Sequence, residues 1–235
     1  MIGDALKRWG LNLPKPRAVL VVAAHWEEKR LSHGKTTQHE KLLYDFYGFP
    51  EELYRVRYPA PGVPWMTDQL ETLLGETLIK REDRCLDHGV WVPLFHMWPE
   101  ADVPVYQISL PRDATDSELF DLGSALAPLR AEGVMIIASG SMTHNLAHLG
   151  WSHQKKPESW ASDFDNWVVR TLEEKNREAL ISWEKPAPHR RLNHPTSEHF
   201  RPLLIAAGAA WEAPVHFPIY GFQFGNLSYR MVQLG

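Results

Sequence analysis

The sequence is poor in cysteine, in long apolar runs and in excess charge of either sign. Its single cysteine, Cys85, excludes an internal disulfide framework and a cysteine-rich zinc site. The apolar runs fall short of the roughly 20 residues that a transmembrane helix needs, and the first residues lack the apolar core of a signal peptide. The formal net charge of −4 predicts no affinity for nucleic acid or for an anionic membrane. We therefore expect a cytoplasmic protein whose partners are neither nucleic acid nor membrane.

Sequence motifs that mark several common enzyme classes are also absent. The chain has no HExxH motif, no glycine-rich phosphate loop with its lysine, and no G-x-S-x-G turn. It contains instead 12 His, 10 Trp and 18 Pro, a composition that predicts loops carrying imidazole and aromatic groups. With 235 residues, 44% of them hydrophobic, and no stretch typical of a linker, residues 1–235 are predicted to form a single domain with its own core.

Two apolar runs, 18–24 and 134–140, predict parallel strands that are buried on both faces. His25 follows the first run and His144 comes soon after the second. Because ligands bind at the carboxyl ends of strands in open α/β sheets, we expect both imidazoles at one edge. The predicted fold class is therefore α/β, with a central, mostly parallel sheet flanked by helices and the active site at the strand carboxyl ends. The remaining predictions are a strand over 103–110, helices over 2–10, 67–78, 116–130, 159–183 and 202–210, and two closing strands over 215–220 and 227–234.

Some local features carry their own expectations. Gly10 is predicted to stop the first helix, Thr67 to cap the second, and Asp116 or Ser117 to cap the helix that follows. The segment 86–93, which contains Asp87 and His88, is interpreted as a loop, and 31–43 as an exposed loop with solvated histidines, His33 and His39.

Four histidines are candidates for chemistry: His25, His88, His144 and His199. Imidazole suits divalent iron or zinc, and an oxygenase site needs two or three protein ligands with open positions. The spacings between these histidines are long, so the pattern alone leaves open whether they bind a metal or pack in the core.

A second candidate feature is the aromatic sequence over 44–62. It can form a loop packed by its own rings or a wall for a flat ligand, and composition does not separate the two. The residues that would form such a wall are Tyr44, Phe46, Tyr47 and Tyr58.

Taken together, these segments resemble a known family. The similarity runs over nearly the whole chain, in the same order, to the class III extradiol ring-cleavage dioxygenases and specifically to their 4,5-DOPA dioxygenase-like branch. The segments that carry the resemblance are AAHWE, YDFYGFP with RYPAPG, LDHGVWVPL, ASGSMTHNL, WASDFDNW, HPTSEHFRPLL and FGNLS.

The resemblance implies an α/β fold around a non-haem Fe(II), with Zn(II) as the metal that purified protein can hold. It also implies an oxidoreductase of aromatic catabolism, which opens a small aromatic diol of the catechol type with O2. His25 and His199 match metal histidines of the family. His144 matches a histidine that ligates the metal or acts as a base, and His88 matches the proton-donating histidine.

The sequence departs from the family pattern at one place. Family members begin with a strand that ends in a Ser-His-Gly-Ser-Pro turn, whose histidine is the first metal ligand, and this sequence starts after that point. The Ser-His-Gly sequence at 32–34 follows a different strand. A truncation or a true loss would each leave a weak metal site, so the departure predicts low or absent dioxygenase activity. It also keeps two alternatives open: a non-catalytic family member with a signalling or binding role, and a zinc-dependent hydrolase.

Overall fold

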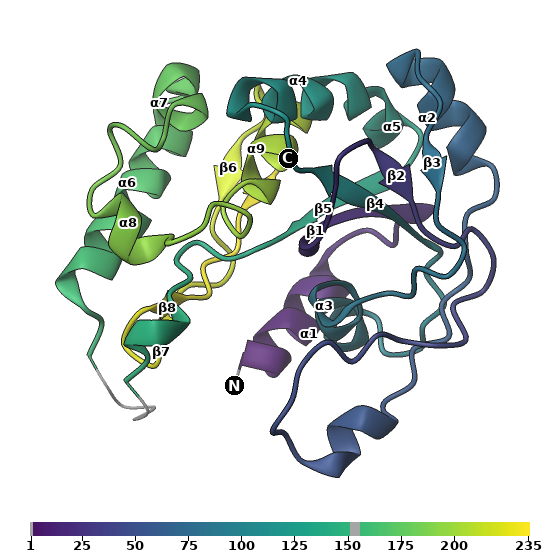
Figure 1. Ribbon diagram of the computed structural model, residues 1–235, viewed down its shortest axis with the longest axis horizontal. Helices are drawn as coiled ribbons and strands as arrows, with labels where there is room; N and C mark the ends of the chain where they lie inside the picture. Colours follow the sequence, from purple (N-terminus) through teal and green to yellow (C-terminus); the bar gives the residue numbers. More distant parts are fainter. Residues whose placement is uncertain (1, 151–155) are drawn as a thin grey trace. The chain divides into compact units, whose positions relative to one another are not determined.

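The computed structural model describes residues 2–150 and 156–235 and divides into two compact units. Unit 1 comprises Met1–Asp113 and Ala125–Ser139, and unit 2 comprises Ala114–Ser124 and Gly140–Gly235. The elements of both units are labelled in Figure 1. The single domain expected for 1–235 stays a prediction.

Unit 1 is built on a five-stranded sheet with the order β3-β2-β4-β1-β5. Central β1 runs parallel to both β4 and β5, and its first seven residues are buried, as the two-sided burial of a central parallel strand requires. Short β2 is parallel to β3 and antiparallel to β4, so the sheet is mixed but mostly parallel, which confirms the α/β prediction. The strands are β1 (Ala18–Glu28), β2 (Ser32–His33), β3 (Ile79–Lys80), β4 (Val105–Pro111) and β5 (Val134–Ser139).

Strand β1 runs further than the apolar run that predicts it. Its pairing with β5 ends at Ala23, and its register with β4 shifts between Val22 and Glu27. His25 lies in this irregular stretch. Bulges of this kind re-aim a side chain and are common beside active sites.

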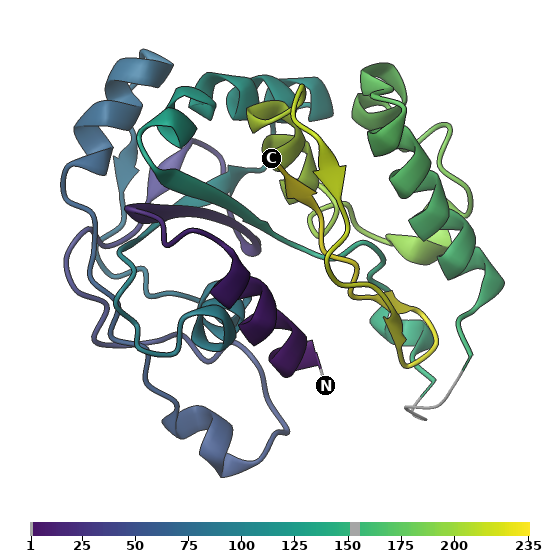
Figure 2. The same cartoon turned by 180° about the vertical axis from the view of Figure 1, so that it is seen from behind.

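Helices cover both faces of this sheet. Helices α1 (Ile2–Asn12) and α3 (His88–Met97) lie on one face, and α2 (Met66–Leu74) and α5 (Pro128–Ala131) lie on the other (Figure 1, and from behind in Figure 2). A 3-10 helix, Glu51–Arg55, lies in the connection before α2.

Two expectations for unit 1 helices are wrong. Helix α1 continues through Gly10 instead of ending there, because α1 packs against α3 at this point and a Cβ on Gly10 would lie 2.6 Å from the carbonyl oxygen of Met97. Helix α2 follows Trp65 with no side-chain cap, since the hydroxyl of Thr67 bonds to the Tyr106 hydroxyl (2.8 Å) instead.

The segment interpreted as a loop around His88 is helix α3. Asp87 caps it by accepting a hydrogen bond from the backbone N–H of Gly89 (3.0 Å), and the helix continues through Pro93. The glycine and proline that argued for a loop are therefore helical, because an N-cap carboxylate outweighs their low helix propensity.

His33 and His39 are buried, which contradicts their expected solvation. His33 is 3% exposed, with Nδ1 2.8 Å from the carbonyl oxygen of Gly34. His39 is 2% exposed, and its Nε2–H donates to the carbonyl oxygen of Val105 (3.0 Å). Burial lowers the pKa of His39, so its ring is neutral.

Unit 2 is largely helical, with two small antiparallel ladders. The helix predicted over 116–130 is divided at Pro128 into α4 and α5, and its cap is Thr115, not Asp116 or Ser117. The side chains of Thr115 and Glu118 bond each other's backbone N–H groups, which is a capping box. The elements are α4 (Asp116–Leu126), a 3-10 turn Leu146–His148, α6 (Ser159–Glu173), α7 (Arg177–Ile181), α8 (Arg190–Asn193), α9 (Pro202–Ala209), and the pairs β6 (Val215–His216) with β9 (Gln233–Leu234) and β7 (Phe222–Gln223) with β8 (Leu227–Ser228).

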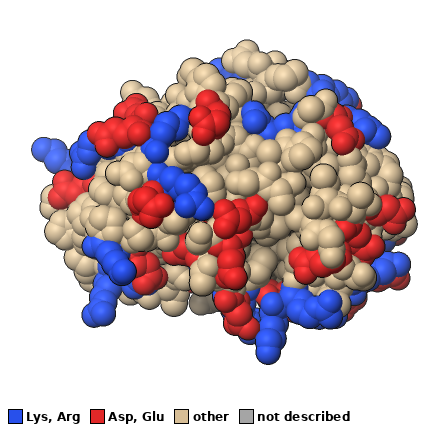
Figure 3. All heavy atoms as spheres, turned by 90° about the horizontal axis from the view of Figure 1, so that it is seen from above, with Lys and Arg blue, Asp and Glu red and all other residues tan. Residues whose placement is uncertain are grey.

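Acidic and basic side chains are interspersed on the face shown in Figure 3. Among the described residues, no helix combines the length and the apolar character that a membrane crossing requires.

Candidate active site

His25 lies in β1 beside two carboxylates. Its Nδ1 is 3.4 Å from Oδ1 of Asp87 and 3.9 Å from Oδ2 of Asp45. A carboxylate near Nδ1 favours the tautomer with its proton on that nitrogen, which leaves the Nε2 lone pair for another ligand. Metal-binding histidines are held in this way.

Asp87 is a fully buried carboxylate with four partners. Arg84 and Gln107 donate to its Oδ2 (2.6 and 2.8 Å), and the backbone N–H of Gly89 donates to Oδ1. Burial alone would raise the pKa of Asp87, but the contact with His25 and the charge of Arg84 lower it below its usual value. Asp87 therefore stays ionised and orients the ring of His25.

Gly89 makes room for that ring. A Cβ at this position would lie 2.8 Å from Nδ1 of His25. The hydroxyl of Ser139, at the end of β5, donates to the carbonyl oxygen of Gly89 (2.6 Å) and fixes the start of α3.

His88 belongs to the same group, but its carboxylate is Asp45. Oδ1 of Asp45 lies 2.7 Å from Nδ1 of His88 and also accepts its backbone N–H (3.0 Å). Burial acts against the ionised form of Asp45, yet the hydrogen bonds from His88 lower its pKa to about 2. The ring of His88 stacks on that of His25, with centroids 4.1 Å apart, and the edge of Phe46 contacts it at 5.7 Å.

Unit 2 brings together the two remaining candidate histidines. The rings of His144 and His199 stack almost in parallel, with centroids 3.5 Å apart. Nδ1 of His199 is 2.8 Å from Oε1 of Glu198, which also accepts a hydrogen bond from the hydroxyl of Thr196 (3.0 Å). The contact with His199 is the main reason that the pKa of Glu198 falls to about 2. His199 precedes α9 in a turn, and Thr196 bonds to Glu198 instead of capping the helix.

The segment that carries His144 is tied to the last part of the chain. The hydroxyl of Thr143 donates to the carbonyl oxygen of Asn226 (2.6 Å), and the side-chain amide of Asn226 donates to the carbonyl oxygen of Asn145 (2.7 Å). Gly140 allows a close approach on the other side, because a Cβ there would lie 2.2 Å from the carbonyl oxygen of His199. The positions of both imidazoles therefore follow from backbone contacts far apart in the sequence.

His194 supports the same segment from the core. Its Nε2–H donates to the carbonyl oxygen of Met142 (3.0 Å), and its ring packs among Phe164, Trp183 and Phe200. Burial lowers the pKa of His194 to about 4, so the ring is neutral at ordinary pH.

The aromatic set predicted to line a substrate wall does not share one environment. Phe46 contacts both His88 and Tyr44, and the hydroxyl of Tyr44 donates to a backbone carbonyl. Tyr58 is 1% exposed and donates to the carbonyl oxygen of Trp98, whereas Tyr47 is 91% exposed. Contact of these four side chains with substrate stays a prediction.

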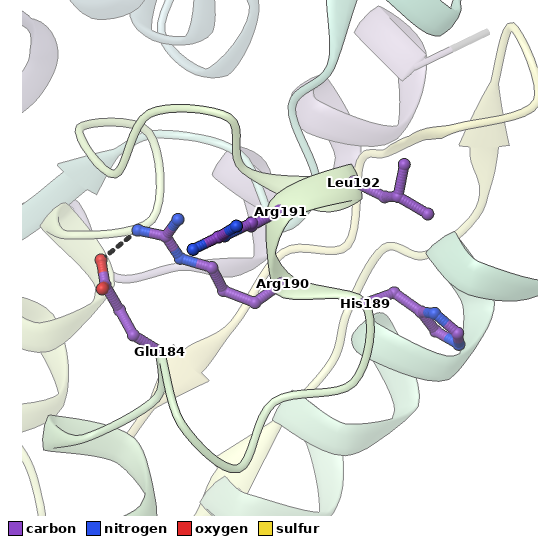
Figure 4. Close-up of a pocket in the computed structure, with 5 residues that line it drawn as sticks. All are labelled: Glu184, His189, Arg190, Arg191 and Leu192. Carbon is purple, nitrogen blue, oxygen red and sulfur yellow. Dashed lines mark hydrogen bonds and ion pairs between the residues drawn. The ribbon is translucent and has the colours of Figure 1, made fainter.

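A surface pocket of about 360 Å³ in unit 2 is separate from these histidines. Arg190 pairs with Glu184 on one side of it and lies over the ring of Trp183, while the side chains of His189 and Leu192 point to the other side (Figure 4). Its lining residues are Glu184, His189, Arg190, Arg191 and Leu192.

Both histidine groups have the donor chemistry of a metal site. In His25, Asp45 and His88, and again in His144, Glu198 and His199, one ligand atom from each residue lies within 4.8 Å of the others. The Asp45–His88 and Glu198–His199 bonds occupy Nδ1 of each histidine, so Nε2 is the nitrogen left for a metal or a substrate.

Residues 4–228 match the model of the catalytic LigB subunit of aromatic ring-opening dioxygenases. The chain belongs to this family. It is 42% identical to the 4,5-DOPA dioxygenase extradiol of Beta vulgaris over 84% of this chain and 75% of that protein. It is 35% identical to the 4,5-DOPA dioxygenase extradiol of Escherichia coli K12 over 97% of this chain and 86% of that protein. The crystal structure of an uncharacterized protein from Escherichia coli K12 superposes with a TM-score of 0.84 at 32% identity, covering 100% and 93% of the two chains.

These comparisons confirm the family and the activity expected from the sequence. The LigB-family chain is an extradiol aromatic ring-opening dioxygenase, which is an oxidoreductase of a non-haem iron family. They favour ring opening over the non-catalytic and zinc-hydrolase alternatives. The impaired activity expected from the departure at the first strand stays a prediction.

Sequence reasoning missed several residues of the two histidine groups in this LigB-family chain. The sequence gives His88 no carboxylate partner, and the structure places Asp45 against its Nδ1. Asp45 lies in the YDFYGFP segment, where only the aromatic residues drew attention. Asn226 and His194 also lie in segments that carry the family resemblance, which is the signal that points to them.

Proposed function

We propose that this dioxygenase opens a DOPA-like catechol beside its hydroxyl groups, with His25 and His199 as ligands of Fe(II) and His144 as either the third ligand or the base. One observation carries the ligand assignment. His25 and His199 each have a carboxylate against Nδ1, from Asp87 and Glu198, and this arrangement leaves Nε2 as the metal-binding nitrogen. The substrate class comes from the relatives, which are named 4,5-DOPA dioxygenases.

The donor set fits a divalent metal, because imidazole suits both Fe(II) and the Zn(II) that can replace it in purified protein. When bound, Fe(II) supplies a Lewis acid for the catechol oxygens and an open position for O2. The protein contributes the orientation of each imidazole.

Two histidines move protons in this proposal. When His144 is not the third ligand, it accepts a proton from a catechol hydroxyl, and its stack on His199 fixes the plane of its ring. His88 keeps the proton on Nδ1 that Asp45 accepts; its Nε2 first takes up a proton from a substrate hydroxyl or from water and then donates that proton as the ring opens.

The wall of the substrate site is proposed to come from the aromatic segment. Phe46 contacts the edge of His88, and Tyr44 packs on Phe46, so a flat ring beside His88 would meet an apolar surface. The small aromatic diol and O2 are the only partners in the proposal, and the cytoplasmic location is retained from the composition.

The proposal is tested by oxygen uptake of the Fe(II)-reconstituted protein with DOPA and with simpler catechols. His25→Ala and His199→Ala should lose bound iron and turnover together. His88→Ala should keep most of its iron and lose turnover. His216→Ala, which removes an exposed histidine from β6, serves as the matched control.

Two results would contradict the proposal. Iron-loaded protein that consumes O2 with simpler catechols and not with DOPA would refute the substrate class, whereas no uptake with any catechol would match the impaired activity expected from the departure at the first strand. Large iron loss in His88→Ala would refute the separation between ligand and proton donor.

A further inference from the structure

We propose that Asp45 is a positioning residue that fixes the ring of His88 with Nε2 presented to the substrate. The inference rests on the proposed function, because it concerns the histidine assigned there as the proton donor. Asp45 belongs to a loop that is distant in the sequence from His88.

Asp45 holds His88 at two points with one oxygen. Its Oδ1 accepts the backbone N–H of His88 (3.0 Å) and the Nδ1–H of the same residue (2.7 Å). The backbone N–H is among the first of α3, and such groups have no partner within their own helix. Asp45 therefore caps the helix and holds the side chain at once, which restricts the rotation of the ring about its Cα–Cβ bond.

The carboxylate also selects the tautomer of the ring. An ionised carboxylate only accepts hydrogen bonds, so Nδ1 must carry the proton that Asp45 accepts. In the neutral ring Nε2 then has the lone pair, and in the charged ring it has a proton to donate. Without Asp45, nothing in this contact favours the Nδ1–H tautomer, and a free imidazole prefers the proton on Nε2.

Neighbouring rings restrict the ring of His88 further. His25 stacks on one face at 4.1 Å, and Phe46, next to Asp45 in the sequence, contacts the ring at 5.7 Å. The side chain is nevertheless 35% exposed, so part of the ring stays accessible to a substrate. With Nδ1 bonded to Asp45, Nε2 is the ring nitrogen left for that substrate.

Asp87 does not take this role, although it precedes His88 in the sequence. Its two oxygens contact Arg84, Gln107, Gly89 and His25. The closest carboxylate thus differs between the two rings: it is Asp87 for His25 and Asp45 for His88, although Asp45 also lies 3.9 Å from Nδ1 of His25.

The first test measures the tautomer directly in Zn(II)-loaded, 15N-histidine-labelled full chain. In wild-type protein the nitrogen shifts of His88 should show a proton on Nδ1 and none on Nε2. In Asp45→Ala the proton should move to Nε2. A wild-type ring that carries its proton on Nε2 would overturn the proposal without any variant.

The second test separates position from charge by kinetics. Asp45→Ala should lower kcat about 10–100-fold, the range for loss of a residue that orients a site histidine, with KM changed less than about threefold. Asp45→Asn keeps an acceptor oxygen and should retain the tautomer and most of the turnover. Glu52→Ala removes an exposed carboxylate from the 3-10 helix after the same loop and should match wild type.

Three further results would each contradict the positioning role of Asp45. Asp45→Asn as inactive as Asp45→Ala would mean that charge and not position is what matters. Loss of bound metal in Asp45→Ala would mean that Asp45 acts through His25. Wild-type turnover in Asp45→Ala beside an inactive His88→Ala would refute the positioning role alone, whereas an active His88→Ala would refute the proposed function of His88.

Discussion

His25 and His88 stack on each other, yet a different carboxylate contacts Nδ1 of each ring. Asp87 is buried and also bonds to Arg84, whereas Asp45 comes from a loop and bonds to both the backbone and the ring of His88. The two aspartates are thus distinguished by the histidine that lies closest to each.

The space around the His25 ring depends on Gly89. We expect Gly89→Ala to push the ring from its position, because the new Cβ would lie 2.8 Å from Nδ1. The destabilisation should be about 1–3 kcal/mol, typical of overpacking. Metal affinity should fall about 10–100-fold, as it does when the groups that orient a metal-binding histidine are disturbed. Competition with a chelator measures the affinity.

Gly34→Ala is the matched control for this substitution. A Cβ at Gly34 would meet its nearest atom at 3.5 Å, an ordinary contact. Equal metal affinity in Gly89→Ala and wild type would show that the His25 ring does not bind the metal from this position.

We expect the free energy of unfolding to depend on pH through His194. Its pKa is lowered to about 4 by burial, from 6.5, with His144, His199 and Glu198 as the titratable groups that also influence it. Between pH 6.5 and 4 the unfolded chain takes up a proton at this residue and the folded chain does not. The contribution of the neutral His194 ring to the free energy of unfolding is therefore fully present above pH 6.5 and is lost as the pH falls toward 4. The loss should amount to about 3 kcal/mol.

Denaturant unfolding between pH 7 and 4 measures this loss, with His194→Gln as the comparison. The difference between the two pH profiles should contain the contribution of His194. A variant profile parallel to that of wild type would show that His194 does not titrate on unfolding.

At the scale of elements, the sequence predicts the sheet better than the helices. Buried parallel strands need long apolar runs, and 18–24 and 134–140 are such runs, so β1 and β5 follow directly. Helix α3 was missed because its start depends on the side chain of Asp87, which outweighs Gly89 and Pro93. A cap is a single side-chain contact, and periodicity does not record it.

The candidate site divides in the same way. His25 and His144 could be picked out because each follows an apolar strand, and the structure stacks His144 on His199. The approach of His25 to these two histidines stays a prediction. Asp45 could not be predicted, since it lies 43 residues before His88 and only the folded loop brings the two together.

The segment around His144 is held by hydrogen bonds to Asn226, near the end of the sequence. Asn226→Ala should destabilise the protein by about 1–3 kcal/mol, because it removes the hydrogen bond to the buried carbonyl oxygen of Asn145. Turnover should fall more than stability explains, since the backbone beside His144 is loosened. Thermal unfolding and oxygen uptake of the same sample measure the two effects.

Asn145→Ala removes a different amide from the same segment and keeps the Asn226 contact to its backbone, so it separates the contributions. Wild-type turnover in Asn226→Ala would contradict the link between this tether and His144.

For the whole molecule, the proposed ligands imply that metal binding and stability are coupled. A metal that binds only the folded chain stabilises it by about 2.7 kcal/mol at 100 times its Kd. We expect Fe(II) or Zn(II) to raise the thermal midpoint and a chelator to reverse the change. His199→Ala should show no such rise, and a rise of the wild-type size in that variant would place the metal elsewhere.

The hydrogen bond between Thr143 and Asn226 also sets the earliest point during translation at which the His144 segment can be held in place. The ribosome must add 83 residues after Thr143 before Asn226 exists, which takes roughly 4 to 17 s at ordinary rates of translation. During that interval the His144 segment has emerged but lacks the contacts that hold it in place. The proposed binding of a metal by His144 and His199 would therefore follow synthesis of nearly the whole chain.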